Sequence, residues 1–151
     1  MILMAQNIKA TERLSARLIR EILRRHGIEK QATVVALEGE LGAGKSVFVR
    51  GAAKFLGIKN KIKSPTFVLI KKYRIPKKQR FSFLYHLDCY RLRDYRDLKI
   101  LEIDEILKMP DNIVFIEWSE RVRKILPKNH IKVHIDHLDK NIRKLTIVYR
   151  Q

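Results

Sequence analysis

The stretch "LEGELGAGKSVF", from Leu37 to Phe48, holds three of the six glycines of the 151-residue chain, followed by a lysine and a serine. Within it, Gly39–Ser46 matches the pattern G-x-x-x-x-G-K-[S/T] at every fixed position. Glycines permit positive φ angles and a close backbone approach, because they carry no Cβ atom. A helix that follows directs its amino-terminal N–H groups at an anion. We interpret the stretch as a loop that binds the phosphates of a nucleoside triphosphate.

Two side chains of the loop add to its backbone donors. Lys45 is expected to reach the β- and γ-phosphates, and the Ser46 hydroxyl to ligate the Mg²⁺ that bridges them. The predicted nucleotide-binding residues of the loop are Gly39, Glu40, Leu41, Gly42, Ala43, Gly44, Lys45, Ser46 and Val47. The alternative interpretation is a glycine-rich turn that carries a chance lysine.

The segments that flank the loop support the first interpretation. Thr33–Leu37, "TVVAL", is a short apolar run rich in β-branched residues, which is typical of a strand buried on both faces in a parallel sheet. The residues from Lys45 to Gly57 form a helical pattern that ends at a glycine. A strand, a glycine-rich loop and a helix thus follow one another in the order that a phosphate-binding loop requires.

Other segments predict further helices and a hairpin. Thr11–Arg25 is expected to form an amphipathic helix with Thr11 as its N-cap, and Gly27 is expected to end it. Residues 68–91 predict two strands around a basic turn, and residues 96–107 predict a helical stretch.

The last third of the chain completes the predicted sheet. Asn112–Ile116, "NIVFI", is a second buried strand, and residues 130–150 alternate well enough to form a terminal hairpin. We therefore predict one α/β domain over residues 1–151. Its central sheet is expected to be mostly parallel or mixed, with the strand before the loop at the centre and helices on its flanks.

Two apolar strands end in an acidic residue. The segment "FSFLYHLD" ends at Asp88, and "IVFIE" ends at Glu117. Sites in α/β proteins lie at the carboxyl ends of the strands, so both side chains are expected near the nucleotide. One carboxylate is expected to hold Mg²⁺ and the other to position the attacking water. The spacing does not assign the two roles, and an ordinary strand-end acid remains the alternative for each.

Two further residues have a functional and a structural interpretation. Thr66, in "SPTF", lies where many phosphate-loop hydrolases carry a switch that senses the γ-phosphate, but a turn before a strand explains it equally. Trp118 follows Glu117. Its ring either stacks on a base or on a partner, or it packs against other side chains of the protein. His86 and Cys89 flank Asp88, but no third ligand supports a metal site there. The lone cysteine has no partner for an internal disulfide.

The charge balance predicts a polyanionic partner. The chain has 33 Lys+Arg against 16 Asp+Glu, a net charge of +17, which favours nucleic acid. A lysine-rich genome is the alternative explanation. Four arginines recur at helical spacing and form either a solvated helix face or a phosphate-binding face. They are Arg13, Arg17, Arg20 and Arg24. Without a long apolar run or a signal-peptide core, the chain is expected to be cytoplasmic and to make no membrane contact.

Four motifs in this order resemble one family. They are "LEGELGAGKSVFVRG", "SPTFVLIKKY", "HLDCYRL" and "IEWSERV", followed by Leu126-Pro127. Together they run from Leu37 to Pro127 and are similar to the bacterial TsaE (YjeE-type) family, small P-loop ATPases of tRNA threonylcarbamoyladenosine synthesis. The flanks match this family loosely through Thr11 and Arg143.

The resemblance implies an ATPase that depends on partners. Members join a TsaB–TsaD heterodimer, in which TsaD transfers a threonylcarbamoyl group to adenosine 37 of tRNAs that read ANN codons. TsaE does not perform the transfer, and its ATP hydrolysis is thought to reset the complex. The implied cofactors are ATP and Mg²⁺. The implied partners are TsaB–TsaD and, indirectly or through the basic surface, tRNA.

The resemblance also implies roles for individual residues. Lys45 and the loop amides hold the phosphates, Ser46 and Glu117 ligate Mg²⁺, and Asp88 lies behind these ligands or assists hydrolysis. Thr66 is the implied switch residue. The further implied nucleotide contacts are Thr11 and Arg143. Trp118 is a candidate nucleotide contact on its own chemistry, because its ring can stack on a base.

The chain departs from the family pattern in three ways. Members often carry a glycine at the position of Glu102 and a threonine at that of Ser46, although either hydroxyl serves Mg²⁺. Nothing in the implied role requires the charge of +17.

Two other classes of protein remain as alternatives. A small nucleotide or metabolite kinase uses the same loop, and Lys71–Arg80 resembles its basic lid, although the position between two strands favours a hairpin. The other is a basic nucleic-acid-binding protein with a vestigial loop. This class is disfavoured because the chain retains all four expected site residues, Lys45, Ser46, Asp88 and Glu117.

Overall fold

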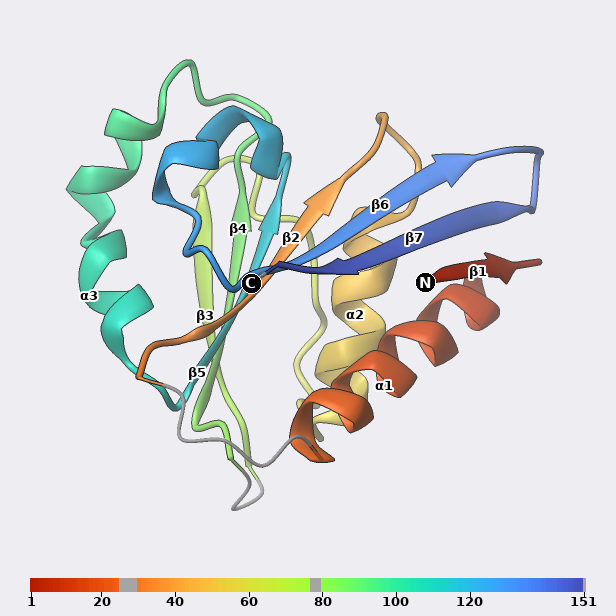
Figure 1. The fold of residues 1–151 in the computed structure, drawn as a ribbon, viewed down its shortest axis with the longest axis horizontal. Coiled ribbons are helices and arrows are strands. Elements are labelled where there is room, and N and C mark those ends of the chain that lie inside the picture. The colour runs from red at the N-terminus through yellow and green to blue at the C-terminus, as the bar shows by residue number, and fades with distance from the viewer. Residues whose placement is uncertain (25–29, 77–79, 151) are drawn as a thin grey trace.

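The strands of the molecule belong to one sheet. The computed structural model describes residues 1–24, 30–76 and 80–150. Within these residues, the strand order is β1-β7-β6-β2-β5-β4-β3 (Figure 1). The strands are β1 (Ile2–Ala5), β2 (Thr33–Glu38), β3 (Ile70–Arg74), β4 (Phe83–Asp88), β5 (Asn112–Glu117), β6 (Ile131–His137) and β7 (Arg143–Tyr149). No helix in the described part of the chain is long and apolar enough to cross a membrane.

The strand before the glycine-rich loop, β2, lies at the centre of the sheet. It pairs in parallel with β5 and with β6, and β5 pairs in parallel with β4. The outer pairs, β3 with β4, β7 with β6 and β1 with β7, are antiparallel. The expected α/β class is thus confirmed, with a mixed sheet and with both expected hairpins. The sequence did not predict β1, which is short and mostly exposed.

Helices cover both faces of the sheet (Figure 1). The helical elements are α1 (Ile8–Arg24), α2 (Lys45–Phe55), the 3₁₀ helix η1 (Tyr95–Leu101), α3 (Ile103–Lys108) and the 3₁₀ helix η2 (Ser119–Ile125). In β5, Phe115 packs in the core layer under α1 and α2, and its neighbour Val114 packs in the layer under η1, α3 and η2. Side chains alternate along a strand, so Glu117 points to the same face as Phe115.

The first helix begins earlier than its expected N-cap. The backbone N–H of Ala10 donates to the Oδ1 of Asn7 at 2.8 Å, so Asn7 caps α1. Thr11 lies inside the helix and is buried, and its hydroxyl lies 3.4 Å from the Asn7 carbonyl oxygen. The expectation that Thr11 is the N-cap is therefore wrong, because an asparagine four residues earlier already satisfies the first turn. The expected helix end at Gly27 lies outside the described residues.

The helical stretch expected over residues 96–107 is two elements. The 3₁₀ helix η1 ends at Leu101, and α3 begins at Ile103. Glu102 between them has a left-handed φ of +52°. Glycine adopts this conformation without the Cβ penalty that other residues carry. A glycine at this position, as the resemblance implies for other family members, would adopt this φ without that penalty.

Candidate functional site

The glycine-rich loop connects β2 to α2 at the carboxyl edge of the sheet. Gly39 has a φ of +136°, and a Cβ built on it would lie 2.4 Å from the carbonyl oxygen of Ile135 in β6. Gly44 has a φ of +108° and forms the left-handed N-cap of α2. No other residue type fits Gly39 without displacing β6, so the tight path of the loop depends on this glycine.

The side chain of Lys45 folds back over the loop. Its Nζ donates to the carbonyl oxygens of Gly39 at 2.6 Å and Glu40 at 2.9 Å. The same Nζ lies 3.9 Å from the centre of the Trp118 ring, and only 4% of the residue is exposed. Burial lowers the pKa of the Lys45 ammonium, and the negative charge of Glu117 opposes this shift. A single cation is thus held at the centre of the loop.

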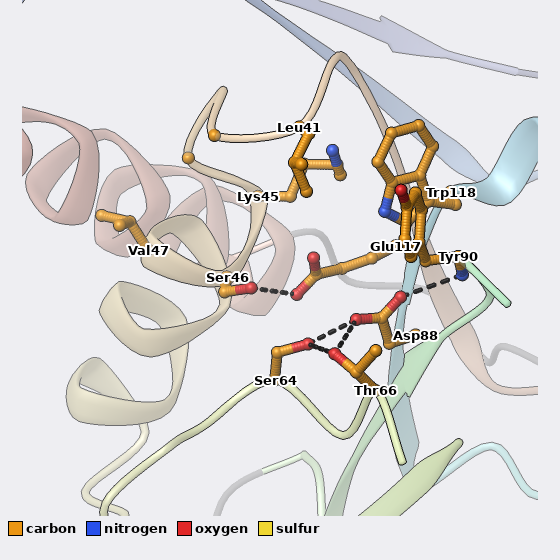
Figure 2. Close-up of a pocket in the computed structure, with 12 residues that line it drawn as sticks. Leu41, Lys45, Ser46, Val47, Ser64, Thr66, Asp88, Tyr90, Glu117 and Trp118 are labelled. Carbon is orange, nitrogen blue, oxygen red and sulfur yellow. Dashed lines mark hydrogen bonds between the residues drawn. The ribbon is translucent and has the colours of Figure 1, made fainter. Parts of the chain in front are cut away.

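Glu117, at the end of β5, joins the loop to β4. Its Oε1 accepts a hydrogen bond from the Ser46 hydroxyl at 2.7 Å and lies 2.7 Å from the Nε2 of His86 (Figure 2 shows the Ser46 contact). His86 is fully buried, and its Nδ1 has no hydrogen-bond partner among the described residues. We did not assign a role to His86 from the sequence. Its place two residues before Asp88, on the same strand face, was the available signal.

Asp88, at the end of β4, joins the sheet to the segment before β3. Its carboxylate accepts hydrogen bonds from the hydroxyls of Ser64 and Thr66, the latter at 3.0 Å. The backbone N–H of Tyr90 donates to its other oxygen at 3.0 Å (Figure 2). Asp88 and Glu117 are register partners on adjacent parallel strands. Ser64 is a second residue that the sequence did not single out, since a serine before a proline suggests only a turn.

Most of the expected site residues line one cavity of about 400 Å³. Those that line it are Leu41, Gly42, Gly44, Lys45, Ser46, Val47, Thr66, Asp88, Glu117 and Trp118. Ser64 and Tyr90 complete its wall. Gly39 and Glu40 do not line it, but they offer their carbonyl oxygens to Lys45. The fold thus gathers residues that are up to 77 positions apart, from Leu41 to Trp118, around the amino end of α2.

Thr11 and Arg143 meet in a second cavity, of about 180 Å³, on the other side of the loop. The Nε of Arg143 donates to the carbonyl oxygen of Ala43 at 3.1 Å, which ties β7 to the loop. Gly42, Gly44 and Val47 belong to the walls of both cavities. Two residues from opposite ends of the sequence therefore lie beside the same turn.

Trp118 turns the chain between β5 and η2. Its φ of +59° is left-handed, which is unusual for a bulky residue. Its ring lies 4.9 Å from the Tyr90 ring, centre to centre, and under the Lys45 ammonium. Trp118 thus forms one wall of the larger cavity, and the strained turn aims it there.

The donor set of the site fits Mg²⁺. Oxygen ligands suit this hard cation, which usually takes one or two carboxylates, keeps several waters and is completed by phosphate oxygens. The Ser46 hydroxyl and the Glu117 carboxylate lie within hydrogen-bond distance of each other, and Asp88 is on the next strand. No group of three His, Cys, Asp or Glu side chains suited to a metal occurs within the described residues.

The basic segment Lys71–Arg80 begins in a strand. Lys71, Lys72 and Arg74 belong to β3, which pairs antiparallel with β4. The interpretation as a hairpin is thus supported over a helical lid, and this weakens the kinase alternative.

The fold and the site define the class of P-loop α/β proteins. A family model described as threonylcarbamoyl adenosine biosynthesis protein TsaE matches residues 5–145. The chain therefore belongs to the TsaE family, as the motifs indicated.

Individual relatives agree with this membership. The chain is 41% identical over 119 residues to a Haemophilus influenzae protein, covering 79% of this chain and 72% of the relative. It is 43% identical over 120 residues to a Nostoc protein, covering 76% and 69%. Both relatives are named tRNA threonylcarbamoyladenosine biosynthesis protein TsaE. The crystal structure of Bacillus subtilis YdiB superposes with a TM-score of 0.76 at 25% identity, covering all of this chain and 86% of the other.

Proposed function

We propose that the protein binds ATP with Mg²⁺ and hydrolyses it as the ATPase of tRNA threonylcarbamoyladenosine synthesis, in complex with TsaB and TsaD. The observation that carries the proposal is the contact between Ser46, in the first turn of α2, and Glu117 at the end of β5. This contact places a hydroxyl and a carboxylate together beside the one lysine of the loop. A triphosphate and its metal require these three groups in one place.

The residues of the loop bind the phosphates in this proposal. The free N–H groups at the amino end of α2 and the helix dipole attract the anion. The Lys45 ammonium exchanges the carbonyl oxygens of Gly39 and Glu40 for β- and γ-phosphate oxygens, which carry more negative charge. Thr11 and Arg143 line the cavity that lies beyond the loop, and we expect the nucleoside part of ATP to bind on this side of the loop.

The two carboxylates have different tasks. Ser46 and Glu117 would hold Mg²⁺, which would supply positive charge beside the phosphates. Asp88 orients the attacking water and accepts its proton as the oxygen bonds to the γ-phosphorus, which releases ADP and phosphate. Thr66, hydrogen-bonded to Asp88, is placed to report the presence of the γ-phosphate to the segment that follows it.

The partners are expected to complete the site. The larger cavity is open to solvent, and water weakens the electrostatic stabilisation of a transition state. We expect slow hydrolysis by the protein alone and faster hydrolysis when TsaB–TsaD closes this cavity.

The test is ATP hydrolysis by the protein alone and with its TsaB–TsaD pair and tRNA. We expect the partners to raise the rate at least tenfold and Lys45→Ala to abolish it. A control, Lys99→Ala, changes an exposed lysine of η1 and should hydrolyse ATP like the wild type. An equal rate of ATP hydrolysis with and without TsaB–TsaD contradicts the proposal. Transfer of phosphate to a small acceptor also contradicts it, because this indicates a kinase.

A further inference from the structure

A group of basic residues lies away from the nucleotide site, on the layer formed by α1 and α2. We name it the basic face, and it consists of Arg13, Arg20, Arg24, Lys54, Lys59 and Lys61. All six residues are exposed. The three arginines follow one stripe of α1, opposite the buried Leu18 and Ile22, because positions seven and four apart share a helix side.

The packing of α1 on α2 brings these residues into one surface. The helices approach so closely that a Cβ on Gly51 would lie 2.6 Å from the backbone of Glu12. The guanidinium of Arg20 lies 5.4 Å from the centre of the Phe55 ring, at the carboxyl end of α2. Both helices end on the same side of the molecule (Figure 1). Lys54 is in the last turn of α2, so the stripe of α1 continues onto it.

The segment after α2 extends the basic face. Ile58 and Ile62 are buried in the core, while Lys59 and Lys61 between them are exposed. The segment therefore lies flat on the protein and presents its lysines outward. Cations at helix ends also stabilise the helix dipole, which explains Arg24 and Lys54 without a ligand. That explanation does not extend to Lys59 and Lys61, which belong to no helix.

The charge of this surface is not neutralised within the described chain. Arg13, Arg24, Lys54, Lys59 and Lys61 form no ion pair with a described residue. The two acidic residues of α1 are already engaged: Glu12 pairs with Arg50 at 2.7 Å, and Glu21 with Arg17 at 3.2 Å. Like charges repel and cost stability, so a surface that gathers them is suited to a polyanion.

The exposed apolar residues distinguish between two polyanionic partners, a membrane surface and a nucleic acid. A helix that lies on a membrane inserts exposed hydrophobic side chains between the lipids. Apart from Ile8, which begins α1 and by helical spacing lies off the arginine stripe, no exposed large hydrophobic residue falls within α1, α2 or residues 56–63. The apolar stripe of α1 is buried. This surface has charge without an inserting side chain, which fits the phosphate backbone of a nucleic acid.

We propose that the basic face binds the sugar–phosphate backbone of structured RNA, without sequence preference. Lys54, Lys59 and Lys61 lie in or after the last turn of α2, whereas the phosphate-binding loop is at its amino end. An α-helix of 11 residues is about 16 Å long. RNA and nucleotide therefore occupy separate sites and bind together. This proposal does not depend on ATP hydrolysis, and RNA binding is measured without nucleotide.

The first test is charge reversal in the segment after α2. We compare Lys59→Glu/Lys61→Glu with Lys99→Glu/Lys128→Glu, which makes the same charge change at exposed lysines outside the basic face. Binding of a labelled tRNA is followed by fluorescence anisotropy over a range of salt concentrations. If about five phosphates are contacted, the wild-type plot of log K against log salt has a slope of about −4. We expect Lys59→Glu/Lys61→Glu to bind tRNA at least about tenfold more weakly than the wild type, with a salt slope about two units shallower. The affinity of the control variant for tRNA should stay within about threefold of the wild-type value.

A second pair tests whether the helices belong to the surface. Arg13→Gln/Lys54→Gln removes two charges and retains good helix formers, so the fold is preserved. We expect this variant to bind RNA more weakly than the wild type does, with unchanged ATP hydrolysis in the absence of RNA. Its thermal unfolding temperature should fall only slightly, because the Lys54 charge at the end of α2 is lost. The proposal fails if this pair has no effect, if the control variant loses as much affinity as the first, or if tRNA binding is insensitive to salt.

Two other partners are tested with the same proteins. Binding to anionic vesicles through Lys59 and Lys61, without binding to tRNA, overturns the proposal in favour of a membrane. Loss of assembly with TsaB–TsaD in the first variant, at wild-type tRNA affinity, overturns it in favour of an acidic protein surface. A failure of the ATPase proposal appears separately, in the Lys45→Ala comparison.

Discussion

The ends of β4 and β5 carry one carboxylate each, and their surroundings differ. Asp88 and Glu117 are register partners on adjacent strands. Glu117 contacts the loop through Ser46 and the sheet through His86. Asp88 contacts Ser64 and Thr66, in the segment between α2 and β3. Two residues of the same chemistry at equivalent positions are thus connected to different parts of the site, one to the expected metal ligand Ser46 and the other to the expected switch residue Thr66.

Among the variants that test this comparison of the two carboxylates, the largest effect is expected from Glu117→Gln. The amide retains the size of the side chain but loses the charge that attracts Mg²⁺, so hydrolysis with TsaB–TsaD should fall about 1,000-fold. The Mg²⁺ concentration that gives half-maximal activity should rise, and nucleotide binding without Mg²⁺ should persist. If the Mg²⁺ requirement is unchanged, Glu117 is not the metal ligand and the comparison fails.

A smaller loss of activity is expected from Asp88→Asn. Removal of a general base lowers the rate by about 100-fold, and the metal ligands remain in place. Steady-state hydrolysis over a Mg²⁺ titration is the measurement. The half-maximal Mg²⁺ concentration should match the wild type. A variant that instead needs far more Mg²⁺ would reverse the roles that we assign to the two carboxylates.

His86→Asn should have an effect of about tenfold on the Mg²⁺ requirement. His86 does not reach the cavity, and it acts by holding the Oε1 of Glu117 in position. Partners of metal ligands typically contribute about 10–100-fold to metal affinity. His86→Gln is the matched variant, because its longer side chain can reach Glu117 again and should restore part of the affinity. Equal Mg²⁺ requirements in both variants and the wild type would show that His86 only fills the core.

The smallest expected effect concerns the thiol beside Asp88. Burial, aided by the negative charge of Asp88, raises the pKa of Cys89 to about 12. A raised pKa leaves less thiolate at neutral pH, and the thiolate is the reactive form. The backbone N–H of Cys89 also donates to the Glu117 carbonyl oxygen at 3.0 Å, which links the two strand ends. We expect a thiol reagent at neutral pH to modify the folded protein much more slowly than the unfolded protein. Equal rates would show that these strand ends open readily.

Local patterns in the sequence predicted much of the fold. The glycine-rich loop was predicted because G-x-x-x-x-G-K-S specifies backbone angles and donors within eight residues. Thr33–Leu37 and Asn112–Ile116 were predicted as strands from continuous apolar runs, and β2 and β5 confirm them. Apolar runs report burial on both faces, which is the property of central strands.

The errors and omissions have physical reasons as well. Thr11 was taken as the N-cap because it precedes the apolar stripe, but Asn7 offers a better side-chain acceptor. The break at Glu102 was missed because a glutamate gives no local signal of a positive φ. The strand β1 was missed because an edge strand buries little and shows weak alternation.

Residue types and short spacings were therefore sufficient to predict the loop, the central strands and the two acidic residues at strand ends. The tertiary structure decided three contacts that the sequence left open. Ser46 meets Glu117, His86 lies against Glu117, and Thr11 and Arg143 lie beside the same turn. These contacts depend on strand order and on how α1 and α2 pack. Strand pairing joins residues that are far apart in the chain, and its free energy comes from side chains that meet only in the folded protein. No local pattern records such a meeting, so the different hydrogen-bond partners of the two carboxylates became visible only in the assembled sheet.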